Sequence, residues 1–154
     1  MAHQRNLKQI PGSVIYTGTK KTAESLVTMI TYSERGANNI SIEDFNQCME
    51  YQGETIRWID FVGVDQTNDL QEIGELFTIH PLILEDIANI QQRPKIEEMG
   101  EQMFVTLKMF AYKNHELEEE QMSILLGKNY VISFQESEKS DDFSEIKDRI
   151  TQGK

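Results

Sequence analysis

Hydrophobic and polar residues alternate along several stretches of this chain, which is the pattern of β-strands. The clearest stretch runs from Met103 to Tyr112, where successive side chains fall on two distinguishable faces. Similar β-branched and aromatic stretches predict five more strands: 14–16, 26–32, 55–61, 121–126 and 130–134. The first two of these are expected to pair antiparallel, and the last two to form a hairpin through a Gly-Lys-Asn turn.

Hydrophobic residues recur with helical spacing in four other segments. These segments are expected to be helices: 42–49, 68–77, 81–89 and 143–150. Ser41 begins a Ser-x-x-Asp pattern that should cap the first, and Pro81 suits the first turn of the third, where its missing N–H costs nothing. Strands that alternate with helices are typical of layered α/β folds.

Composition bounds the possible functions. With 154 residues, 38% hydrophobic and 27% charged, the chain suits one folded domain over residues 1–154. A net charge of -11 argues against nucleic acid or an anionic membrane surface as a partner. Cys48 is the only cysteine, so we expect a reducing, cytoplasmic compartment and a small buried side chain there. The polar start, residues 1–9, does not resemble a signal peptide.

Adjacent carboxylates at Glu85 and Asp86 are the first candidates for chemistry. On a helix they would point roughly 100° apart, so they cannot act together on one substrate atom. Since no nucleotide loop, nucleophile elbow or His-Glu-x-x-His motif is present either, the sequence gives no support for an enzyme. Asp86 could offer one hard oxygen ligand to a hydrated Mg²⁺. The alternative is that Glu85 and Asp86 are solvated charges on the surface of the helix. His80, directly before Pro81, is expected to cap this helix.

The stretch from Thr78 to Glu98 combines His-Pro, Glu-Asp and Arg-Pro-Lys around one short helix. Three other segments accompany it in order along the chain: 53–60, 104–109 and 126–136. Together these segments resemble the cytoplasmic domain of the CorA family of magnesium channels. One departure is Gln91, where members often carry His.

The resemblance implies an α/β fold, a three-layer α/β/α sandwich with a mixed parallel and antiparallel sheet. It implies a Mg²⁺-sensing, gating domain at the cytoplasmic face of the cell membrane. The parent would be a homopentameric channel for Mg²⁺ or Co²⁺, whose stalk and transmembrane helices are absent from residues 1–154. It further implies regulatory Mg²⁺ between neighbouring subunits, held by Asp86, with Glu85 in a second site. Because each subunit supplies half of a site, metal binding by this domain alone should be weak.

Two alternatives stay open from the sequence. One is a zinc-transporting relative of the same architecture, which flux of each metal would distinguish. The other is a stand-alone soluble domain that binds cations or partners and has no pore. A stop codon after Lys154 would favour that second alternative.

Overall fold

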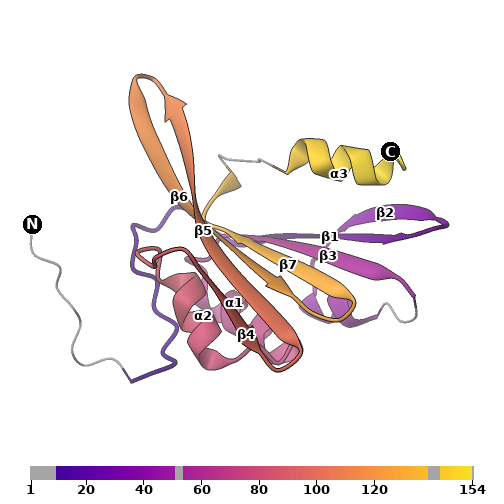
Figure 1. Ribbon diagram of the computed structural model, residues 1–154, viewed down its shortest axis with the longest axis horizontal. Helices are drawn as coiled ribbons and strands as arrows, with labels where there is room; N and C mark the ends of the chain where they lie inside the picture. The colour runs from indigo at the N-terminus through magenta and orange to yellow at the C-terminus, as the bar shows by residue number, and fades with distance from the viewer. Residues whose placement is uncertain (1–9, 51–53, 139–142, 154) are drawn as a thin grey trace, which may run out of the picture.

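The computed structural model describes residues 10–50, 54–138 and 143–153 of the chain. Residues 1–9, where no signal peptide is expected, therefore lie outside the described residues. The strands of the structure are β1 (Leu26–Ser33), β2 (Gly36–Ser41), β3 (Ile56–Val62), β4 (Lys95–Met99), β5 (Gln102–Lys113), β6 (Glu116–Leu126) and β7 (Tyr130–Gln135). They form one seven-stranded sheet in the order β2-β1-β3-β7-β6-β5-β4 (Figure 1). Among the strands of the described residues, only β3 and β7 pair in parallel, so the sheet is mixed as expected.

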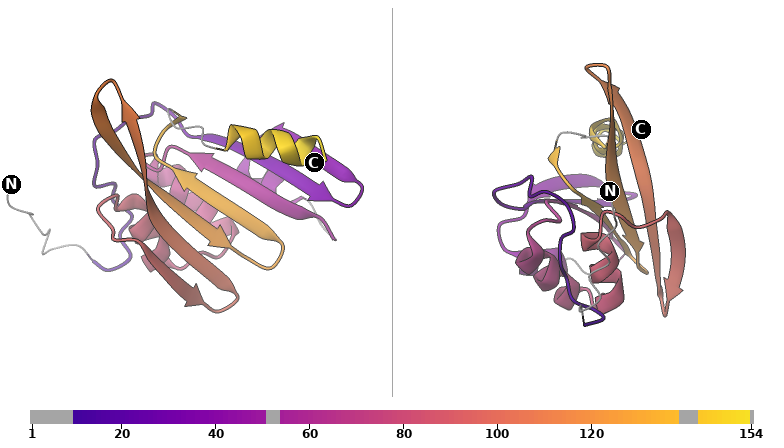
Figure 2. Two further views of the ribbon diagram at one scale, coloured as in Figure 1. Left: turned by 45° about the horizontal axis from the view of Figure 1, so that its top comes forward. Right: turned by 90° about the vertical axis from the view of Figure 1, so that its left-hand side faces the viewer.

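Helices lie on both faces of this sheet. The inner face is covered by α1 (Thr67–Leu76), α2 (Pro81–Ala88) and the 3-10 helix η1 (Phe45–Met49). A last helix, α3 (Ser144–Thr151), lies on the outer face and packs against β1 and β2 (Figure 2). The three-layer α/β/α arrangement expected from the sequence is therefore confirmed.

The hydrophobic core lies between the sheet and the pair α1–α2. β3 is central, and its alternation brings Ile59 and Phe61 onto the inner face with no exposure. Ile83 and Ile87 of α2 meet this face and are almost completely buried. Gly74 lets the two helices pack closely, because a Cβ there would lie 2.4 Å from a methyl carbon of Leu84, which would have to move. Burial of the core thus fixes α2, together with its two carboxylates, against the sheet.

Two expectations for the first half of the chain were wrong. Residues 14–16 form no strand, and β1 pairs instead with β3 and with the unpredicted edge strand β2. The helix expected over 42–49 is the shorter η1, and its cap is Asp44 rather than Ser41. Asp44 accepts the N–H of Asn46 at 2.9 Å, and the Gln47 side chain accepts the N–H of Asp44 at 3.1 Å. A carboxylate next to the first turn displaced the predicted cap.

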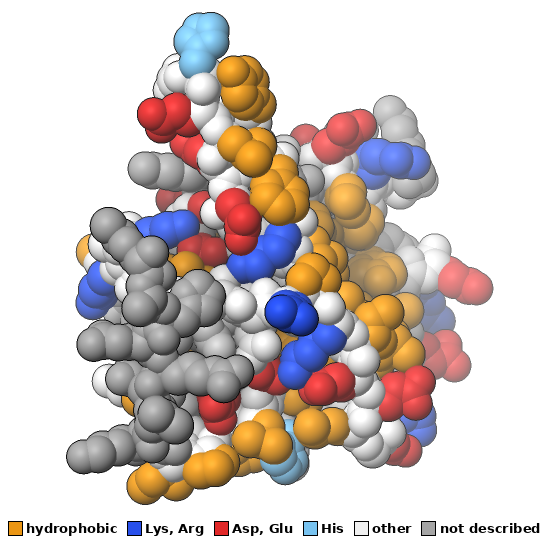
Figure 3. All heavy atoms as spheres, turned by 60° about the vertical axis from the view of Figure 1, so that its left-hand side comes forward, with side chains coloured by type: hydrophobic (Ala, Val, Ile, Leu, Met, Phe, Trp, Pro, Cys, Tyr) orange, Lys and Arg blue, Asp and Glu red, His pale blue; other side chains and the backbone are white. Residues whose placement is uncertain are grey.

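The hairpin of β5 and β6 projects beyond its neighbours. Its strands pair as far as Lys113 and Glu116, whereas β4 and β7 pair only with the sheet end of the hairpin. Figure 3 shows hydrophobic side chains along this arm beside acidic ones, and Phe110, Tyr112 and Leu117 are its large exposed apolar residues. Within the described ranges, none of the helices has the length and apolar character needed to cross a membrane.

Candidate metal site

The two predicted carboxylates lie on α2, whose start the sequence sets locally. Pro81 occupies the first turn, and Nδ1 of His80 accepts the N–H of Leu82 at 3.2 Å, which confirms the predicted histidine cap. The helix ends near Asn89, as expected. Because the core takes the opposite side of α2, Glu85 and Asp86 lie at its partly exposed edge.

Asp86 is held by two side chains that follow it closely in sequence. Its Oδ2 lies 2.6 Å from Nζ of Lys95, and its Oδ1 accepts a hydrogen bond from Nε2 of Gln92. Lys95 also lies 3.1 Å from Oε1 of Glu97. Burial lowers the pKa of Lys95, but its hydrogen bonds to Asp86 and Glu97 outweigh this effect, so the pKa lies above its ordinary value.

Glu85 has a different partner. Its Oε2 accepts the N–H of Gly12 at 2.7 Å and so ties the N-terminal turn to α2. Gly12 has a φ of +87°, and a Cβ there would lie 3.0 Å from Cβ of Pro81, so glycine suits this close approach. Glu85 and Asp86 therefore bond to separate parts of the chain and do not converge on one point.

Asp86 is the predicted metal ligand on α2. Asp86 supplies one carboxylate, and both of its oxygens have protein partners. Across residues 10–50, 54–138 and 143–153, no three His, Cys, Asp or Glu side chains gather as a metal-binding group. Mg²⁺ commonly keeps several waters and takes one or two carboxylates, so the Asp86 carboxylate suits it as one ligand.

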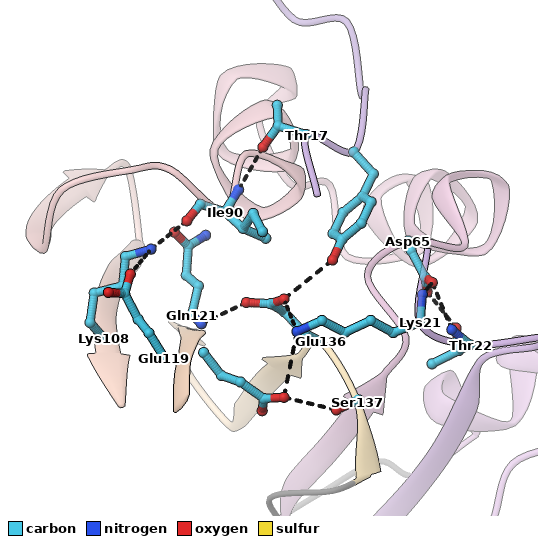
Figure 4. A network of polar contacts seen from close by, with 12 residues as sticks. Thr17, Lys21, Thr22, Asp65, Ile90, Lys108, Glu119, Gln121, Glu136 and Ser137 are labelled. Carbon is cyan, nitrogen blue, oxygen red and sulfur yellow. Dashed lines mark hydrogen bonds and ion pairs between the residues drawn. The ribbon is translucent and has the colours of Figure 1, made fainter. Parts of the chain in front are cut away.

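A second polar network, which the sequence did not predict, surrounds Glu136 (Figure 4). Glu136 is 2% exposed. Its Oε2 accepts from Nζ of Lys21 at 2.7 Å and from the hydroxyl of Tyr16 at 3.2 Å, and its Oε1 accepts the N–H of Gln121 at 2.8 Å. Burial, with the nearby Glu136 charge, raises the pKa of Tyr16. Lys21 also lies 3.6 Å from Glu120.

This network reaches the C-terminal end of α2. Nε2 of Gln121 donates to the backbone carbonyl of Asp86 at 3.2 Å. The N–H of Ile90 donates to Oγ1 of Thr17 at 3.1 Å, and Nζ of Lys108 donates to the Ile90 carbonyl (Figure 4). The N-terminal segment and the base of the β5–β6 hairpin thus hold the segment that carries Asp86. No sequence signal marks these bonds, since Tyr16 and Glu136 are 120 positions apart.

A third polar cluster lies on the outer face beneath α3. Asp60 is 3% exposed and lies 2.6 Å from Nζ of Lys147, while Ser133 and Gln135 donate to its other oxygen. A cavity of about 280 Å³ opens beside this pair. Asp60 therefore ties α3 to the sheet and is already satisfied by protein partners.

The chain matches the family described as CorA-like Mg2+ transporter protein over residues 53–154. It is 41% identical over 143 residues to the Cobalt/magnesium transport protein CorA of Thermotoga maritima, covering 91% of this chain and 40% of that relative. The chain thus spans less than half of the relative's length.

Solved structures agree on the fold. The soluble domain of CorA from Methanocaldococcus jannaschii gives a TM-score of 0.56 at 16% identity, over 82% of this chain and 47% of that one. The ZntB cytoplasmic domain from Vibrio parahaemolyticus gives 0.60 at 13% identity, over 82% and 50%. At such low identities these matches show the fold alone.

The fold is that of the soluble domain of CorA and of the ZntB cytoplasmic domain. The family match and the identity with the Thermotoga maritima protein go further, and this chain belongs to the CorA family. That family consists of magnesium and cobalt transport proteins and not of enzymes, which confirms the expectation drawn from the missing catalytic motifs.

Proposed function

We propose that this chain is the cytoplasmic, Mg²⁺-sensing and gating domain of a pentameric CorA-like channel that carries Mg²⁺ or Co²⁺ across the cell membrane. The observation that carries the proposal is the 41% identity with the Cobalt/magnesium transport protein CorA of Thermotoga maritima. The position of Asp86 supports it, because its carboxylate lies at the partly exposed edge of a helix that the core holds in place.

The proposed sensing acts between subunits. Asp86 of one subunit and an acidic residue of its neighbour would hold Mg²⁺ together, with Glu85 contributing to a second site. At a concentration equal to its dissociation constant, one site that favours the closed ring contributes only ~0.4 kcal/mol, and five contribute ~2 kcal/mol. The small contribution of each site fits a gate that responds to a change in cytosolic magnesium and is not locked by it.

A chimaera tests this proposal. This chain would replace the matching segment of the Thermotoga maritima relative, and magnesium inhibition of the channel current would be measured with Asp86 intact and with Asp86→Ala. We expect inhibition in the first chimaera and a shift to higher magnesium, or loss of inhibition, in the second. Glu75→Ala, which removes an exposed carboxylate from α1, is the matched control. Equal inhibition in all three proteins would count against Asp86 as the sensor.

The fold shared with the ZntB cytoplasmic domain keeps a zinc-transporting relative as the second candidate. Uptake of Mg²⁺, Co²⁺ and Zn²⁺ by cells that express the complete natural gene would separate the two. Zinc uptake without magnesium uptake would favour the second candidate. Sequencing the gene beyond the codon for Lys154 would also test the third possibility, a stand-alone domain.

A further inference from the structure

The carboxylate of Asp86 already has a cation beside it. Nζ of Lys95 lies 2.6 Å from Oδ2, and the Asp86 side chain is 14% exposed while that of Lys95 is 29% exposed. Gln92 bonds to the other oxygen. Both partners come from the turn and strand start that follow α2 in sequence, so a short local segment supplies them.

An ammonium group and a divalent cation cannot share this carboxylate at low cost. A Mg²⁺ ion lies about 2.0–2.1 Å from its oxygen ligands, so an ammonium hydrogen-bonded to the same carboxylate would be a close like charge. Repulsion between such charges is appreciable near a protein surface, where screening by water is incomplete. Lys95 therefore has to move away before Asp86 can act as a metal ligand.

The structure offers Lys95 a second carboxylate to move toward. Glu97 is two residues further along β4, so its side chain is on the same face of the strand as that of Lys95. Oε1 of Glu97 is already 3.1 Å from the ammonium, and the Glu97 side chain is 38% exposed. Lys95 can therefore leave Asp86, keep an ionic partner and gain contact with water without any change in the strand.

We propose that Lys95 is an internal competitor for the Asp86 carboxylate and thereby raises the magnesium concentration at which this carboxylate binds metal. The inference rests on the proposed sensing role of Asp86 and adds to it the residue that sets its threshold. It also gives Lys95 a role without metal, because it neutralises Asp86 and so prevents an unpaired carboxylate from facing a neighbouring subunit.

The test is a magnesium titration of this chain, followed by the NMR shifts of the Asp86 and Ile87 amides, with Mn²⁺ broadening of the same signals as a second readout. Lys95→Met should lower the half-saturating concentration about tenfold, the change that corresponds to about 1.4 kcal/mol. Lys95→Arg keeps the charge and should stay within about twofold of the unchanged chain. Lys128→Met removes the same charge from the exposed β6–β7 turn and should also stay within about twofold.

Asp86→Ala separates failure of this inference from failure of the proposed function. If Asp86→Ala abolishes the site-specific shifts but Lys95→Met binds Mg²⁺ no more tightly than Lys128→Met, the competitor role of Lys95 is overturned. The sensing role of Asp86 then stands. If Asp86→Ala titrates like the unchanged chain, Asp86 is no ligand and both fail. In the expected outcome the gain from Lys95→Met disappears when Asp86→Ala is added. Absence of saturation in every variant, Lys95→Met included, also overturns the inference.

Discussion

Two lysine–carboxylate pairs of this domain have nearly equal lengths and different surroundings. Lys21 lies 2.7 Å from Glu136, and Lys95 lies 2.6 Å from Asp86. The Glu136 side chain is 3% exposed and that of Asp86 is 14% exposed. Residues bonded to Glu136 come from the N-terminal segment and from β6, whereas both side-chain partners of Asp86 follow it within nine positions.

The difference shows that the length of an ion pair does not reveal its role. The Glu136 pair joins residues that are 115 positions apart, so it ties the N-terminal segment to the residue that follows β7. The Asp86 pair closes a short local turn and leaves Lys95 in reach of Glu97 and of water. The first pair is suited to holding the domain together, and the second to exchanging its cation.

Removing the lysine of each pair should give the sharpest contrast. Lys21→Met leaves Glu136 buried without its cation and should lower the free energy of unfolding by about 3 kcal/mol. Lys95→Met leaves the more exposed Asp86 and should cost less than about 1 kcal/mol. Urea unfolding of both variants measures the difference. The double variant Lys21→Met with Glu136→Gln should recover part of the loss, because the uncompensated charge is gone. Equal losses of free energy of unfolding in Lys21→Met and Lys95→Met would show that the two ion pairs do not differ in their contribution to stability.

Acid unfolding tests the Lys21–Glu136 side of this comparison through Asp65, which anchors the segment that carries Lys21. Oδ2 of Asp65 accepts the N–H groups of Lys21 and Thr22 at 2.6 and 2.8 Å. Burial raises the pKa of Asp65, but these bonds and that from the Thr22 hydroxyl outweigh it, so the pKa lies below 3.8. A depressed folded-state pKa gives stability that is present above pH 3.8 and is lost as the pH falls through the folded value.

Asp65→Asn should therefore cost about 1–2 kcal/mol at pH 7 and flatten the fall of stability below pH 4. Unfolding in urea at several pH values between 2.5 and 7 would show both effects. Asp148→Asn changes an exposed carboxylate on α3 and serves as the control. An unchanged acid slope in Asp65→Asn would mean that the N-terminal segment is held mainly by Lys21.

Local signals explain what could be predicted from the sequence. Pro81 and the helical spacing predicted α2 to within about a residue, and the Gly-Lys-Asn turn predicted the β6–β7 hairpin. Strand β2, Gly-Ala-Asn-Asn-Ile-Ser, was not predicted, because an edge strand with few apolar residues shows no alternation of hydrophobic and polar residues. The hydrogen-bond partners of Glu136 were not predicted, because tertiary packing alone brings them together. Asp86 was a candidate ligand from its chemistry and from the resemblance, and Glu85 from the resemblance alone. Their role as metal ligands stays a prediction.

The smallest expected effect on stability is that of Asp86→Asn. Asparagine keeps an oxygen that can accept from Lys95, and it removes a negative charge near the C-terminal end of α2, where the helix dipole disfavours anions. These effects oppose the loss of the ion pair, so the free energy of unfolding should change by less than about 1 kcal/mol. Urea unfolding would be measured beside Lys21→Met under the same conditions. A loss as large as that of Lys21→Met would show that Asp86 is a structural anchor like Glu136, and an anchor of that kind could not release its lysine to a metal ion.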